Sequence, residues 1–160
     1  MIAQHVKDTT ESLLKLHPKT PEPVVFFLAG RLPGEALLHL RQLTLFGMIC
    51  HLNGNILHSI VGQLLTGSSQ SSKNWVADIR DLCYQYNLPH PLALLKEPMT
   101  KVSFKSLCKN NVTDFWQDKL RKNADKLKDK SLKFFNPYFM SLSRPHPMWS
   151  WATTSYQVNK

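Results

Sequence analysis

The sequence contains little of what a disulfide-rich or disordered chain would need. It has three cysteines and six glycines in 160 residues. Cys50, Cys83 and Cys108 are too few and too widely spaced for a disulfide framework or a zinc cluster. We therefore expect reduced, mostly buried thiols inside a cell. The low glycine content and 42% hydrophobic residues predict a globular chain, long enough to bury a core.

Long uninterrupted apolar runs are also missing. Polar and charged side chains near the N-terminus occupy the place where a signal peptide has its apolar core. The most apolar stretch, residues 32–52, is interrupted by His39, Arg41, Gln42 and His51, whereas a membrane span needs about 20 apolar residues. We expect an intracellular protein, nuclear or cytoplasmic, that is neither secreted nor inserted in a membrane.

Acidic residues are scarce, and the positive charge is concentrated in one segment. Asp and Glu number 11 against 20 Lys and Arg, which gives a net charge of +9. Such a balance favours polyanionic partners, nucleic acid before membrane. Ten of the basic residues and only four aspartates lie between residues 99 and 135. The candidate contacts to RNA or DNA in this segment are Lys101, Lys105, Lys109, Lys119, Arg121, Lys122 and Lys126.

The spacing of the first three candidates is the most informative part of this segment. Lys101, Lys105 and Lys109 recur every four residues, which places them on one side of a helix. Lysines in such a row could follow a phosphate backbone. A solvated helix face is the simpler interpretation of charge alone.

No residue pattern of a catalytic, metal or cofactor site is present. The sequence has no phosphate-binding glycine loop and no Ser/His/Asp or Cys/His arrangement. Cys50, His51 and His58 form the closest group of possible metal ligands, but no pair has a metal-site spacing. His39 is expected to be a hydrogen-bonded structural histidine. We expect no enzyme activity, no metal, no cofactor and no small-molecule substrate.

Two pairs of carboxylates are candidates for acid–base or two-metal sites. Each pair lies on the polar side of an amphipathic pattern with an arginine nearby. They are predicted to be solvated helix faces: Asp78 with Asp81, and Asp114 with Asp118.

Residues 32–52 predict the central helix of the fold. Pro33 and Glu35 are typical of a first helical turn, and Asn53-Gly54 is a stop signal. The apolar side chains fall on every side of the helical wheel, so we expect burial on several faces. They are Leu37, Leu38, Leu40, Leu43, Leu45, Phe46, Met48 and Ile49.

Start and stop signals predict the other helices. Thr20 with Pro21, followed by Gly30, favours a helix, although the β-rich residues 24–28 leave a buried strand as the alternative. Asn55 and Ser72 are predicted caps of the next two helices. Further helical patterns cover residues 92–96 and, from Thr100 to about Leu127, the longest helix.

The longest helix is predicted to bend or break. Its apolar groups before and after Asn110-Asn111 differ by about a quarter-turn, and both asparagines are poor helix formers. The fold class is therefore mainly α: an irregular multi-helix domain, residues 1–130, around the buried helix 32–52. Residues 131–160 are predicted to be an irregular extension rich in proline and aromatics, truncated before a further domain.

Several stretches together resemble one known protein family. They are residues 20–33, 32–52, 75–95, 112–121 and 139–149. In the same order, and over about residues 12–150, they resemble the region that follows the reverse transcriptase domain in non-LTR retrotransposon polyproteins of animals. The resemblance implies a helical, thumb-adjacent or linker region that helps to hold template RNA or target DNA beside the polymerase.

The departures from that family limit what can be transferred. The polymerase core motif Tyr/Phe-Ala-Asp-Asp, the endonuclease and the Cys/His-rich tail of such polyproteins do not occur in this sequence. The resemblance thus implies a non-catalytic fragment with RNA or DNA, and the polymerase portion of the parent polyprotein, as partners. The alternatives are a helical protein–protein interaction module whose aromatic tail docks a partner, or a decayed fragment without a selected function.

Overall fold

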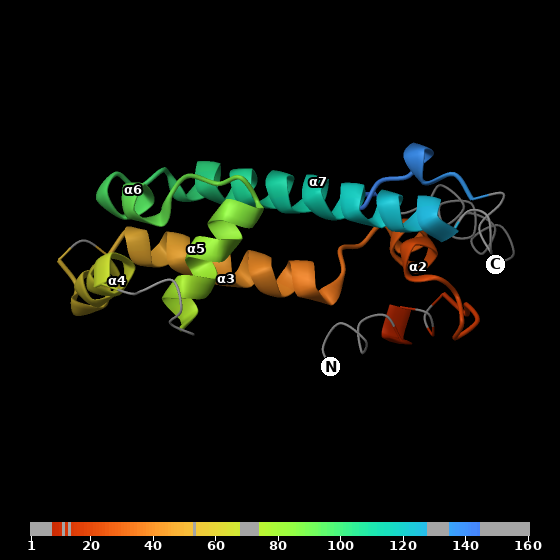
Figure 1. Ribbon diagram of the computed structural model, residues 1–160, viewed down its shortest axis with the longest axis horizontal. Helices are drawn as coiled ribbons and strands as arrows, with labels where there is room; N and C mark the ends of the chain where they lie inside the picture. The colour runs from red at the N-terminus through yellow and green to blue at the C-terminus, as the bar shows by residue number, and fades with distance from the viewer. Residues whose placement is uncertain are drawn as a thin grey trace, which may run out of the picture. The chain divides into compact units, whose positions relative to one another are not determined.

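The chain is mainly α-helical, as the sequence predicts. The computed structural model describes residues 8–10, 12, 14–52, 54–67, 74–127 and 135–144 (Figure 1). Within these ranges the β-structure consists of one isolated bridge, Ser141 with Arg144. The chain divides into two compact units: unit 1, residues 1–37 and 113–160, and unit 2, residues 38–112. The domain boundary predicted near residue 130 falls outside the described residues, as do residues 145–160 of the predicted extension.

In unit 1, helix α2 (Glu22–Ala29) forms where a strand was the alternative. Pro21 precedes the helix, and Gly30 closes it with a positive φ of 59°, a backbone conformation that glycine adopts without strain. Val25, Phe26 and Phe27 are buried. The cap position is Pro21, which makes no side-chain hydrogen bond, and the Thr20 hydroxyl donates a 2.6 Å hydrogen bond to the His17 carbonyl.

Helix α3 (Gly34–Cys50) confirms the helix predicted over residues 32–52. Its buried side chains are Ala36, Leu43, Phe46, Ile49 and Cys50. The expected burial on several faces is not observed, because four large apolar side chains of α3 are exposed: Leu37, Leu38, Leu45 and Met48. Apolar side chains on every side of a helix allow burial on every side. Whether each side is buried depends on which other elements pack against it, and the pattern does not specify those elements.

Three helices of unit 2 follow α3 along the chain. Helix α4 (Ile56–Gly67) begins after Asn55, whose Oδ1 accepts a 2.9 Å hydrogen bond from the Leu57 amide. Helix α4 packs against both α5 (Trp75–Gln85) and α6 (Pro91–Lys96). The cap of α5 is Asn74, which accepts from the Ala77 amide at 2.8 Å; the predicted cap, Ser72, lies outside the described residues.

Helix α7 (Lys101–Leu127) begins and ends where the sequence predicts. The Thr100 hydroxyl accepts a hydrogen bond from the Ser103 amide at 3.2 Å and so caps the first turn. Every residue through Asn110 and Asn111 is helical, so the predicted break is wrong.

The apolar pattern of α7 changes direction for another reason. Its buried side chains recur every four residues, at Phe104, Cys108, Val112, Trp116, Leu120 and Ala124. Four residues exceed one helical turn, so each step rotates the buried direction by about 40°. The apolar groups thus drift around a continuous helix, and neither a break nor a bend is needed.

The described part of the C-terminal extension packs onto the second half of α7, within unit 1. Its 3-10 helix η1 (Pro137–Phe139) also packs against α2. The Tyr138 hydroxyl donates to Asp125 Oδ2 at 2.7 Å. Among the described helices, none combines the length and the apolar character that crossing a bilayer would require.

Candidate nucleic-acid interface

The first half of α7 carries three unpaired positive charges. Lys101, Lys105 and Lys109 are exposed, and no described carboxylate lies within ion-pair distance of any of them. The helix has no acidic residue before Asp114. Each four-residue step advances about 6 Å along the axis, so these lysines form a short row of cations on one side of the helix.

The second half of α7 has more basic residues but less free charge. Four basic side chains and three aspartates lie between residues 113 and 127, which leaves one net positive charge. Lys119 Nζ lies 3.9 Å from the centroid of the Trp116 ring. Lys122 Nζ is paired with Asp118 Oδ2 at 2.7 Å, and this hydrogen bond raises the pKa of the lysine. Lys126 is exposed.

Arg121 differs from the other predicted contacts because its guanidinium packs inside unit 1. Its Nη2 donates to the Met140 carbonyl at 3.4 Å. The guanidinium carbon lies 5.5 Å from the centroid of the Tyr138 ring, within the range of a cation–π contact. These contacts hold the segment around η1 against α7. Lys101, Lys105 and Lys109 therefore form a row in which no lysine has an ion pair with a carboxylate of the described residues.

The cysteines are free and buried, as expected. Burial raises the thiol pKa of Cys83 to about 12 and those of Cys50 and Cys108 to about 11. At neutral pH all three are therefore protonated and are poor nucleophiles. In the described part of the chain, no three His, Cys, Asp or Glu side chains are grouped so that they could hold a metal ion. His39 is hydrogen-bonded, as predicted, with its Nδ1 2.6 Å from the Tyr86 hydroxyl.

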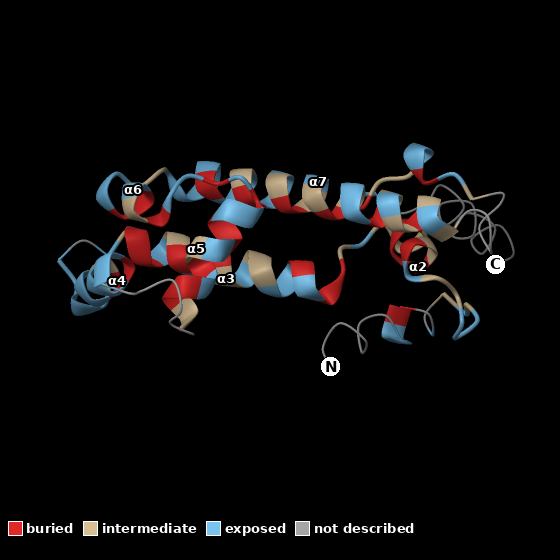
Figure 2. Ribbon diagram, viewed as in Figure 1, coloured by how far each residue is buried: buried red, intermediate tan, exposed pale blue. Residues whose placement is uncertain are grey.

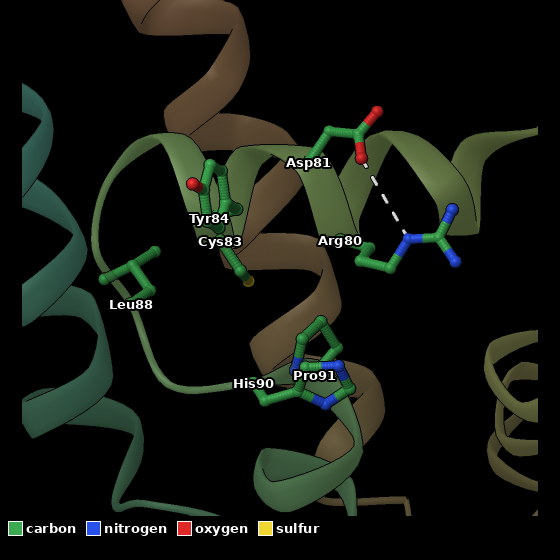
Figure 3. A pocket seen from close by; sticks show the side chains of 7 residues that line it. All are labelled: Arg80, Asp81, Cys83, Tyr84, Leu88, His90 and Pro91. Carbon is green, nitrogen blue, oxygen red and sulfur yellow. Dashed lines mark ion pairs between the residues drawn. The ribbon is translucent and has the colours of Figure 1, made fainter. Parts of the chain in front are cut away.

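A pocket in unit 2 was not predicted from the sequence. It has a volume of about 490 Å³ and lies between the end of α5 and the start of α6 (Figure 3). Its lining residues are Arg80, Asp81, Cys83, Tyr84, Leu88, His90 and Pro91. The available signal was an aromatic residue, Tyr84, outside the apolar stripe of α5, followed closely by the proline-flanked His90.

Helix α4 presents an apolar surface to solvent. Val61 and Leu65 are buried, but most other residues of the helix are exposed (Figure 2). The exposed side chains of this surface, called the α4 stripe below, are Ile56, Leu57, Ile60 and Leu64. No Asp, Glu, Lys or Arg occurs in α4. Helix α4 therefore buries Val61 and Leu65 within unit 2 and leaves its other large apolar side chains exposed.

The described residues thus present three separate surface features: the lysine row of α7, the pocket at the end of α5 and the α4 stripe. Compared with known proteins, the chain matches no family model, no curated protein and no solved structure.

Proposed function

We propose that this protein is a non-catalytic helical segment that contacts RNA or DNA without sequence preference, through the first half of α7. The observation that carries the proposal is the row formed by Lys101, Lys105 and Lys109, exposed and without a described acidic partner. Phosphate contacts by such lysines release condensed counterions, which supplies most of the affinity in nonspecific binding.

The resemblance to the region following the reverse transcriptase domain of non-LTR retrotransposons supports the same function. A segment of that origin would act in the nucleus or cytoplasm beside the polymerase portion of its parent polyprotein. The mainly helical structure is compatible with a supporting role of this kind. We place no catalytic step in this chain.

The experiment that tests this proposal is a salt titration of nucleic-acid binding. The purified chain should bind single- or double-stranded nucleic acid at about 50 mM salt, and its affinity should fall steeply as salt rises. Replacing Lys101, Lys105 and Lys109 by Gln should flatten the plot of log K against log salt by up to about 3 units, since each phosphate contact contributes about 0.9.

A matched control distinguishes the effect of this lysine row on binding from the effect of the net charge of the chain. Lys15, Lys19 and Lys96 are also exposed, so their replacement by Gln removes the same three charges from other surfaces. This control variant should leave the slope close to that of the wild-type protein. Equal slopes for the two triple variants, or no binding at 50 mM salt, would contradict the proposal.

A protein–protein interaction module is the second candidate function. The specific observation in its favour is the α4 stripe, where four large aliphatic side chains are 40–76% exposed. Exposed apolar patches without charge are typical of surfaces that other proteins cover. Under this alternative, replacing the three lysines of α7 by Gln would leave the affinity for the protein partner unchanged.

A further inference from the structure

The pocket in unit 2 has the size and composition of a ligand site. Its volume of about 490 Å³ falls within the range of pockets that bind small organic groups, roughly 300–1,000 Å³. Apolar and aromatic side chains form most of its wall, and a few polar groups lie at its edge (Figure 3).

Hydrogen bonds fix the turn that forms one side of this pocket. The Leu88 amide donates to the Cys83 carbonyl at 2.8 Å. From α7, Asn111 Nδ2 donates to the carbonyls of Tyr86 at 2.9 Å and Asn87 at 3.3 Å. These bonds hold the turn without a ligand, so the backbone on this side of the pocket is already in place before binding.

Tyr84 is the most unusual residue of the pocket. Its side chain is 91% exposed although it lines a concave site. In Figure 3 Tyr84 and Cys83 lie on the α5 side of the hollow, and His90 and Pro91 lie across from them. An aromatic ring with so little packing leaves a face available to stack on a planar ligand, and such stacking strengthens binding on the order of 5- to 100-fold per nucleobase.

The polar groups at the edge include both a donor and an acceptor. His90 Nδ1 accepts a hydrogen bond from the Leu92 amide at 3.3 Å, so the neutral ring carries its proton on Nε2 and can donate it. The Asp81 carboxylate, 80% exposed, is an acceptor and lies 4.0 Å from Arg80 Nε. Arg80 offsets the negative charge of Asp81, and the His90 donor can meet a ring nitrogen or carbonyl acceptor on the edge of a heterocyclic base.

We propose that this pocket binds an unpaired nucleobase of single-stranded RNA or DNA, with the Tyr84 ring stacked on the base and His90 contacting its edge. The inference rests on the proposed function, which it narrows to strands with unpaired bases. The site binds without covalent chemistry, since the Cys83 thiol is buried and protonated.

The test compares a short labelled single strand with an abasic strand of equal length, by fluorescence anisotropy on the full chain. The wild-type protein should bind the base-containing strand on the order of 5- to 100-fold more tightly. Tyr84→Ala should abolish this preference and leave binding of the abasic strand unchanged. Tyr84→Phe, which keeps the stacking ring, should retain most of it.

Two controls make the comparison specific. Phe139→Ala removes another aromatic side chain, 90% exposed, that does not line this pocket, and it should keep the preference for bases. Because the Tyr84 side chain is so exposed, the Tyr84→Ala variant should have the melting temperature of the wild-type protein. Thermal denaturation followed by circular dichroism measures this.

Each result decides between the two proposals. Equal binding of both strands, or a base preference that survives Tyr84→Ala, would overturn the pocket assignment and leave the lysine contact standing. A base preference that depends on Tyr84, with the α7 triple variant unchanged in salt slope, would overturn the lysine contact and leave the pocket. Failure to bind either strand would overturn both.

Discussion

At the level of single residues, short polar side chains define the ends of several helices. Asn55 and Thr100 cap α4 and α7 through amides two or three residues away, so local sequence was enough to predict them. Asn111 was predicted to weaken α7, yet it donates to two carbonyls at the end of α5, 24 and 25 residues distant. No local pattern identifies a partner so far along the chain.

The buried thiols predict how stability depends on pH. Burial raises the pKa of Cys83 from 9.0 to about 12 in the folded chain. Above pH 9 the unfolded state loses this proton while the folded state keeps it, so the free energy of unfolding should fall as pH rises, by at most about 1.4 kcal/mol per pH unit for each thiol. Below pH 9 the thiol is protonated in both states and should contribute nothing to the pH dependence of stability.

Urea unfolding of the wild-type chain and of Cys83→Ala, at pH 8 and pH 10, measures this contribution. The variant should be less stable at both pH values because it lacks a buried side chain, but its stability should decline less between them. Parallel declines would show that the Cys83 thiol ionises normally in the folded protein.

At the level of elements, the helices were predictable and their packing was not. Helices α3 and α7 lie where composition and start and stop signals place them. The burial of each helix depends on which neighbours it meets, and sequence periodicity carries no such information. Leu45 and Met48 of α3 are therefore exposed against expectation, and the pocket beside α5 was missed because a turn creates it between two helices.

One close approach between helices gives a sharp prediction. A Cβ atom at Gly47 of α3 would lie 2.5 Å from Phe104 Cδ1 and 2.7 Å from Phe104 Cε1 of α7. Alanine normally stabilises a helix interior relative to glycine, but here the clash should dominate, and Gly47→Ala should cost about 1–3 kcal/mol. Urea denaturation provides the measurement.

The matched control is Gly67→Ala, because no heavy atom lies within 4 Å of a Cβ at that position. It should be neutral or slightly stabilising. Combining Gly47→Ala with Phe104→Leu should show a favourable coupling, since the shorter side chain relieves the clash. Additive losses in that double variant would mean that the ring and the glycine do not meet.

At the level of the whole molecule, a net charge of +9 coexists with exposed apolar surface. Charge of one sign keeps chains apart, whereas large aliphatic side chains in solvent favour association. The composition predicted the first property. The exposed apolar surface could not be predicted, because Ile56 and Leu64 have the same helical spacing as side chains that are buried in a core.

The α4 stripe predicts that the folded chain binds a hydrophobic dye. Replacing Ile56 and Ile60 by Gln should lower the fluorescence of bound 1-anilinonaphthalene-8-sulfonate, while the melting temperature changes little because these side chains are 76% and 45% exposed. Val61→Gln, on the buried side of α4, is the contrasting variant and should be strongly destabilising. Unchanged fluorescence in the double variant would mean that another surface takes up the dye.

The contact between Gly47 and Phe104 also constrains how this sequence can change during evolution. A side chain can be gained at position 47 only after the ring at position 104 has been replaced by something smaller. The reverse order passes through a destabilised intermediate that selection would remove. Related sequences should therefore keep glycine opposite an aromatic ring or show both positions altered together, and this covariation would be a signature of the contact between the two helices.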